Sequence, residues 1–145
     1  MKRRFLFVLV LAALVPSGSA LAAPRGATIK LAKTNRGKIL TNSSGYTLYM
    51  FQLDKRRKDV CVNIPDCTTV WPLVTTKAKP VAGTGVKARL LGTIKLKDGT
   101  HQVTYDGWPL YTYMGDFSPR STQFIGLKQS GGFWWALNAA GRLIK

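Results

Sequence analysis

The feature that most constrains the fold is a ten-residue stretch that occurs twice. Residues 45–54 read GYTLYMFQLD and residues 107–116 read GWPLYTYMGD, so glycine, leucine, tyrosine and aspartate match without a gap. Both copies contain the pattern Tyr-x-aromatic-x-x-Asp. Its side chains are Tyr49, Phe51 and Asp54 in the first copy and Tyr111, Tyr113 and Asp116 in the second. An internal repeat of this kind predicts two related structural units that pack against each other.

The similarity extends beyond the motif on both sides. The sequence Thr-Ile-Lys-Leu stands at residues 28–31 and again at 93–96, and Trp71-Pro72-Leu73 aligns with Trp135-Ala136-Leu137. We therefore place repeat one at about residues 28–74 and repeat two at about 86–145. The segment 75–85, which contains one proline and two glycines, is interpreted as the linker between them.

The N-terminus has the pattern of a signal peptide, which we assign to residues 1–22. Three basic residues are followed by an apolar stretch at 5–15, too short to span a bilayer, and by Ala20-Leu21-Ala22. Cleavage is expected between Ala22 and Ala23, although an uncleaved anchor is the alternative. No cysteine lies near this point, so we expect an exported domain at 23–145, periplasmic, cell-surface or extracellular, without a lipid anchor.

The expected mature chain is strongly basic. Removing Lys2, Arg3 and Arg4 from the 22 basic residues leaves 19 against six acidic ones, a net charge of +13. Such a charge attracts anionic polymers and membrane surfaces, although a merely solvated basic exterior is the alternative. For an exported chain, acidic cell-envelope polymers or a membrane surface are expected partners and nucleic acid is not. The oligomeric state stays open.

Two cysteines, Cys61 and Cys67, are predicted to form a disulfide. Disulfides are the usual state of paired cysteines in an exported chain, and the Cys-x5-Cys spacing is not that of a zinc site. The bridge would clip the loop that follows the first motif. Closing so short a loop stabilises the fold by about 2 kcal/mol.

The hydrophobic pattern predicts a mostly β fold of short strands, arranged as one domain of two repeats with pseudo-two-fold symmetry. No sustained helical period occurs after the signal peptide, and only a short helical turn is expected after Cys67. Within 46–51, alternation places Tyr49 and Phe51 on one face and Leu48 and Met50 on the other, both apolar enough to be buried. Strands are expected at 28–33, 38–41, 46–51, within 86–97, and at 102–105, 109–114, 133–137 and 142–145.

The repeated tyrosines and aspartates allow a structural and a functional interpretation. In the structural one, the aromatic rings form the core and each aspartate accepts backbone N–H bonds at a strand end. In the functional one, Tyr49, Tyr111, Asp54 and Asp116 line a surface cleft between the repeats. Paired aspartates can also perform acid–base hydrolysis, but the surrounding residues lack the turn that presents such carboxylates to water. We predict no catalytic residue, no metal ligand and no cofactor.

A basic run follows the first motif. Its residues are Lys55, Arg56, Arg57 and Lys58. A solvated loop is the preferred interpretation, and an anion-binding patch beside the disulfide loop is the alternative. Binding of the second kind would weaken steeply with salt.

Together, the two motifs, the cysteine pair, Trp71-Pro72 and the stretch 98–116 resemble the bacterial "secreted repeat of unknown function" family, often described as predicted lipoproteins. The resemblance covers nearly all of 28–145 and implies an exported envelope protein with paired repeats, without an assigned activity. Two departures are that no lipobox cysteine is present and that residues 118–122, SPRST, replace a glycine- and aspartate-rich run. We expect a non-enzymatic structural or binding module with a basic surface. The alternative is a redox- or metal-linked protein that uses its tyrosines, methionines and cysteine pair.

Overall fold

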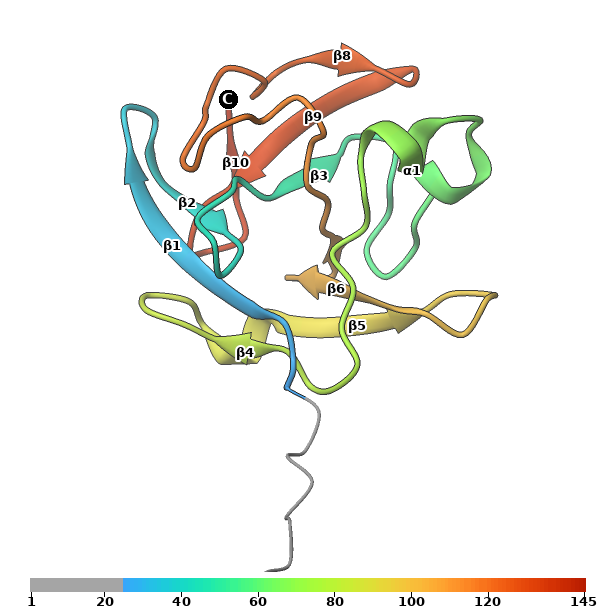
Figure 1. Ribbon diagram of the computed structural model, residues 1–145, viewed down its shortest axis with the longest axis horizontal. Helices are drawn as coiled ribbons and strands as arrows, with labels where there is room; N and C mark the ends of the chain where they lie inside the picture. Colours follow the sequence, from blue (N-terminus) through green and yellow to red (C-terminus); the bar gives the residue numbers. More distant parts are fainter. Residues whose placement is uncertain (1–24) are drawn as a thin grey trace, which may run out of the picture.

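The structure is a computed structural model that describes residues 25–145. The signal peptide predicted at 1–22 and its cleavage point lie outside the described residues. Within 25–145 the chain forms ten short strands and three short helical segments (Figure 1). The prediction of a mostly β fold is therefore confirmed.

The strands form three small sheets. The first has the order β2-β1-β4, with β1 (Thr28–Thr34), β2 (Gly37–Thr41) and β4 (Val81–Ala82). The second has the order β10-β9-β3, with β8 also on β9; its members are β3 (Tyr49–Phe51), β8 (Lys128–Gln129), β9 (Gly132–Leu137) and β10 (Leu143–Ile144). The third is β5-β6-β7, with β5 (Leu91–Lys95), β6 (His101–Tyr105) and β7 (Trp108–Pro109).

The helical segments are η1 (Cys61–Asn63), α1 (Cys67–Val70) and η2 (Ala88–Leu90). The helical turn expected after Cys67 is confirmed as α1. It ends at Trp71, whose N–H donates to the Cys67 carbonyl at 2.8 Å, because the next residue, Pro72, has no N–H to continue it. Among residues 25–145, no helix is long and apolar enough to cross a membrane.

Some strands differ from the prediction. The segment expected at 46–51 is a regular strand only at Tyr49–Phe51, and the one expected at 109–114 is reduced to β7 and two isolated bridges at Tyr111. Tyr111 lies between Tyr49 and Leu73, which belong to different segments, so no continuous ladder forms on either side. Conversely, β4 lies within the predicted linker, and β8 lies outside every predicted strand.

The alternation predicted along the first motif strand is confirmed by the core. Tyr49 and Phe51 belong to one hydrophobic cluster together with Trp71 and Trp134. Leu48 and Met50, which point the other way, belong to a second cluster with the β6 side chains. The strand is buried on both faces, so it packs against both hydrophobic clusters.

Each motif strand pairs with the segment that follows the other motif. In the first motif, Tyr49 lies opposite Ala136 and Phe51 opposite Trp134, both on β9 of the second repeat. In the second motif, Tyr111 bridges to Leu73 of the first repeat. The two motifs also contact each other, because the Tyr49 and Tyr111 N–H groups each donate to the other's carbonyl at 2.9 Å. The repeats are thus interlocked; an exact two-fold relation between them stays a prediction.

The glycine shared by the two motif copies has a conformational cause. Gly45 has φ +88° and Gly107 has φ +81°, both in the left-handed region that side chains rarely adopt. A residue with a Cβ at either position would strain the turn that precedes the motif segment. This explains why glycine stands four residues before the motif tyrosine in both copies.

Candidate functional site

The motif tyrosines and aspartates form two hydrogen bonds that cross between the repeats. The Tyr49 hydroxyl donates to Asp116 Oδ2 at 2.9 Å, and the Tyr111 hydroxyl donates to Asp54 Oδ2 at 2.7 Å. Each copy of the motif therefore supplies the donor for the carboxyl group of the other copy. Both copies of the Tyr-x-aromatic-x-x-Asp pattern are therefore needed to form this reciprocal pair of hydrogen bonds.

These four side chains do not form a surface cleft. Tyr49 and Tyr111 are fully buried, and Asp54 and Asp116 are only 4% and 8% exposed. The structural interpretation of the motif fits this burial, since Asp54 Oδ1 also accepts the Val60 backbone N–H at 2.7 Å. That bond holds the start of the disulfide loop against the end of the motif strand.

Four aromatic rings form a continuous stack through the first cluster. The ring centroids are 4.3 Å apart for Phe51 and Trp134, 3.8 Å for Trp134 and Trp71, and 4.2 Å for Trp71 and Tyr113. Phe51 and Tyr113, the aromatic residues of the two motifs, are thus the outer layers of one stack. Burial of such large rings supplies much of the hydrophobic stabilisation available to a small domain.

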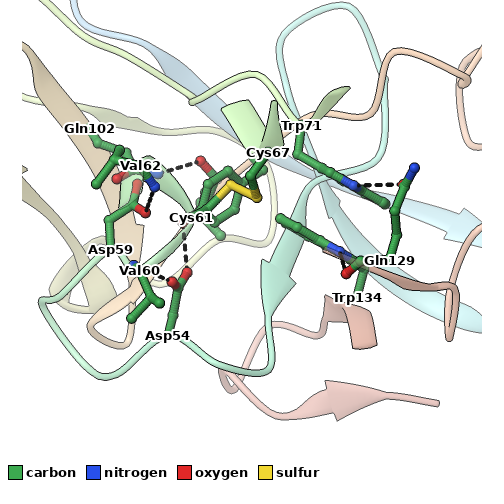
Figure 2. Close-up of a disulfide and its surroundings, with 12 residues drawn as sticks. Asp54, Asp59, Val60, Cys61, Val62, Cys67, Trp71, Gln102, Gln129 and Trp134 are labelled. Carbon is green, nitrogen blue, oxygen red and sulfur yellow. Dashed lines mark hydrogen bonds between the residues drawn. A yellow bond between two sulfur atoms is a disulfide. The ribbon is translucent and has the colours of Figure 1, made fainter. Parts of the chain in front are cut away.

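The alignment of the repeats by sequence placed Trp135 opposite Trp71, but the stack uses Trp134. Both indoles also bond Gln129: the Trp71 N–H donates to its side-chain oxygen at 3.0 Å and the Trp134 N–H to its carbonyl at 3.2 Å (Figure 2). Nothing in the sequence pattern indicated Gln129. The Trp134-Trp135 pair could have suggested either partner, and only the register of β9 on β3 selects Trp134.

The predicted disulfide is present. Cys61 and Cys67 are joined, and their side chains are 0% and 1% exposed. The bridge lies between the tryptophan stack on one side and a group of carboxyl side chains on the other (Figure 2). The bridge itself is therefore packed into the core, while residues 62, 63, 65 and 66 of the loop that it clips are exposed.

We expect loss of the disulfide to cost at least about 2 kcal/mol of unfolding free energy, because the unfolded chain regains loop entropy. The test is a Cys61→Ala, Cys67→Ala double variant, with urea unfolding followed by tryptophan fluorescence. Unfolding of the wild-type protein with and without reductant gives the matched comparison. A double variant as stable as the oxidised protein would contradict this prediction.

A second buried carboxyl group, Asp59, lies beside Asp54 and was missed from the sequence. Asp59 is 6% exposed, and its Oδ1 accepts the Val62 N–H at 3.0 Å (Figure 2). Its Oδ2 has no hydrogen-bond partner, and neither has Oε1 of the fully buried Gln102 nearby. Asp59 directly follows the basic run, so the sequence pattern assigns it to an exposed charged loop.

Burial shifts the pKa values of this group. Burial raises the pKa of Asp54 to about 7, although hydrogen bonds from the Val60 N–H and the Tyr111 hydroxyl oppose the shift. Burial likewise raises the pKa values of Asp59 and Asp116 above their usual range. Burial and the neighbouring carboxyl groups raise the pKa values of Tyr49 and Tyr111, so both phenols stay protonated as donors.

The basic run forms a tight turn whose four side chains are all exposed. The Lys55 and Lys58 backbones bond each other reciprocally, at 3.1 and 2.9 Å. One of the four side chains is already engaged: the Arg56 guanidinium pairs with Asp106 Oδ2 at 2.8 Å and lies 5.4 Å from the centre of the Trp108 ring. The other three, Lys55, Arg57 and Lys58, are exposed and remain available to an anion.

His101 is exposed at the start of β6. Among residues 25–145, no three side chains of the His, Cys, Asp and Glu types are grouped so as to hold a metal ion.

Comparison with protein families assigns the repeat. The family described as "secreted repeat of unknown function" matches residues 30–75 and again residues 92–138. The chain belongs to this family. The resemblance inferred from the motifs is confirmed, and the match at both copies agrees with two repeats in an exported protein. Comparison with curated proteins and with solved structures finds no match.

Proposed function

We propose that this secreted-repeat protein is a non-enzymatic binding module of the cell envelope that holds acidic polymers on its basic surface. The motif itself serves as the core that keeps two repeats together. What remains for binding is the outside of the molecule, whose charge is extreme for a domain of this size.

The observation that carries the proposal is the unequal burial of charge. All 19 lysines and arginines of residues 25–145 are exposed. Three of the six aspartates are buried at 4%, 6% and 8% exposure, namely Asp54, Asp59 and Asp116. Burying half of the acids leaves three aspartates to offset 19 cations, and the pairing of Arg56 with Asp106 is the single ion pair found in the described chain. Unbalanced surface charge of this kind raises the local concentration of anionic partners.

We expect the protein to elute from an immobilised acidic polysaccharide at a higher salt concentration than from a plain cation exchanger of similar charge density. Counter-ions screen both columns, but only the polysaccharide offers hydroxyl groups and ring faces in addition to charge. The measurement is the salt concentration at the elution midpoint on each column.

A basic protein of similar net charge and unrelated fold is the control for simple ion exchange. Elution of the secreted-repeat protein at the same salt concentration from both columns would contradict recognition of the polymer. It would leave only non-specific attraction.

A further inference from the structure

One cavity gathers cations from both repeats. It measures about 680 Å³ and lies between the segment 57–68, which carries the disulfide loop, and the turn of the β5–β6 hairpin. Arg57 and Lys58 line it from the first repeat, and Lys95 and Lys97 line it from the second. Figure 1 shows the disulfide loop with α1 and the end of the β5–β6 hairpin on the same side of the molecule. We refer to this cavity as the basic cleft.

The four cations of the basic cleft are exposed, and none makes an ion pair within residues 25–145. Two aspartates also line the cleft, Asp59 and Asp98. Asp98 accepts the Thr100 N–H at 2.8 Å, which caps its own hairpin turn, and Asp59 is buried at the base. Four cations against two acids leave an excess of positive charge in a concave site, where like charges repel and an anion is attracted.

The walls of the basic cleft are fixed by backbone hydrogen bonds. On one side, the Arg57 N–H donates to the Gly107 carbonyl at 2.7 Å, which ties the basic turn to the second repeat. On the other, the Leu96 N–H donates to the Thr100 carbonyl at 2.8 Å and closes the hairpin. Preorganised walls lower the entropy lost on binding.

Arg57 lies within the tight turn closed by Lys55 and Lys58. Its φ is +62°, in the left-handed region where glycine or asparagine is favoured at this position of a turn. A side chain in this conformation costs about 1 kcal/mol or more.

The basic cleft is not only charged. Leu73 and Ile94 are half-buried in its wall, and Val62 is 43% exposed beside them. A ligand that fits such a site carries negative charges at its edge and an apolar face at its centre. Sugar rings that bear carboxylates have this form, and the cavity has the size of sites that hold drug-sized ligands.

We propose that the basic cleft binds a short segment of a carboxylate-bearing polysaccharide, with the ring faces on Leu73 and Ile94 and the carboxylates at Arg57, Lys58, Lys95 and Lys97. This inference rests on the proposed function and assigns it a site. A polymer chain is preferred to a membrane because the cations converge on a concavity. The largest exposed apolar side chain, Phe117 at 91% exposure, does not line it.

The test is titration of the protein with a galacturonic acid hexamer, followed by calorimetry. A Lys95→Gln, Lys97→Gln variant should lower the affinity roughly tenfold, because two charge-assisted contacts are lost. The matched control is Lys33→Gln, Lys38→Gln, which removes the same charge from exposed positions that face each other on β1 and β2. It should change the affinity by no more than about twofold, through long-range attraction alone.

Three outcomes would overturn the basic cleft as the site. The first is an equal loss of affinity in both variants, the second is equal binding of the fully methyl-esterified hexamer, and the third is preference for anionic phospholipid vesicles over the hexamer. The first would leave the proposed function standing, with the polymer held by diffuse charge. Failure of the proposed function itself is recognised differently, by identical salt elution of the wild-type protein from the polysaccharide and exchanger columns.

Discussion

Trp134→Ala should destabilise the protein by about 3–5 kcal/mol, the largest effect we expect from any single substitution. Trp134 is fully buried, stacks on Trp71 at an interplanar angle of 1°, and also contacts Phe51. Removal of the indole would leave a cavity in the middle of the four-ring stack. The measurement is the free energy of unfolding from urea denaturation, followed by circular dichroism because the fluorescence of the variant is altered.

Trp135→Ala is the matched control for this prediction. Trp135 is the next residue on β9, points to the other side of the strand, and is only partly buried. Its loss should cost roughly half as much or less, since less apolar surface leaves water on folding. If the two variants were equally destabilised, the stack would not be the centre of the core, and the sequence alignment with Trp135 would be the better guide.

Much of the fold could be predicted from the sequence because its signals are local. The alternation of Leu48, Tyr49, Met50 and Phe51 predicts a strand buried on both faces, and the core has this arrangement. The Asp98-Gly99 turn predicts the β5–β6 hairpin. Pro109 predicts either the first residue of a strand or an edge, and it lies in β7, the edge strand of its sheet. The disulfide follows from an even cysteine count in an exported chain.

What the sequence could not supply is the crossing of the repeats. Comparison of the two copies shows that Tyr49 resembles Tyr111, but not that each tyrosine bonds the aspartate of the other copy. Which aspartate each tyrosine reaches depends on the register between the two motif segments, and that register is set by the packing of the core. The burial of Asp59 could not be predicted either. Its sequence neighbours place it in the exposed basic run, but tertiary packing buries it.

The crossing also explains why a motif with the composition of an active site need not be one. A buried carboxyl group requires a donor, and each motif aspartate accepts a hydrogen bond from the tyrosine of the other repeat. Each of these two pairs forms only when both copies of the motif are present. The binding that we propose would use the outside of the domain, where the two repeats bring cations together.

The second large effect should appear as a dependence of stability on pH that is specific to Asp54. Burial raises the pKa of this carboxyl group from 3.8 to about 7 in the folded protein. The folded state therefore binds more protons than the unfolded state between about pH 4 and 7. The stabilisation from Asp54 is complete below its unfolded pKa and is lost as the pH rises through the folded pKa. The shift corresponds to about 4 kcal/mol across this window.

Asp54→Asn removes the titration but keeps a polar group of the same shape against the Val60 N–H. Relative to the wild-type protein, this variant should gain about 4 kcal/mol of unfolding free energy on going from pH 4 to pH 8. Asp66→Asn is the control, because Asp66 is an exposed carboxyl group on the disulfide loop, and its difference from the wild-type protein should stay flat over this range. The opposite slope for Asp54→Asn would mean that the Val60 N–H and the Tyr111 hydroxyl hold Asp54 ionised. The ionised Asp54 carboxylate would then hold the start of the disulfide loop, and the hydrogen bond from the Tyr111 hydroxyl would offset the cost of burying its charge.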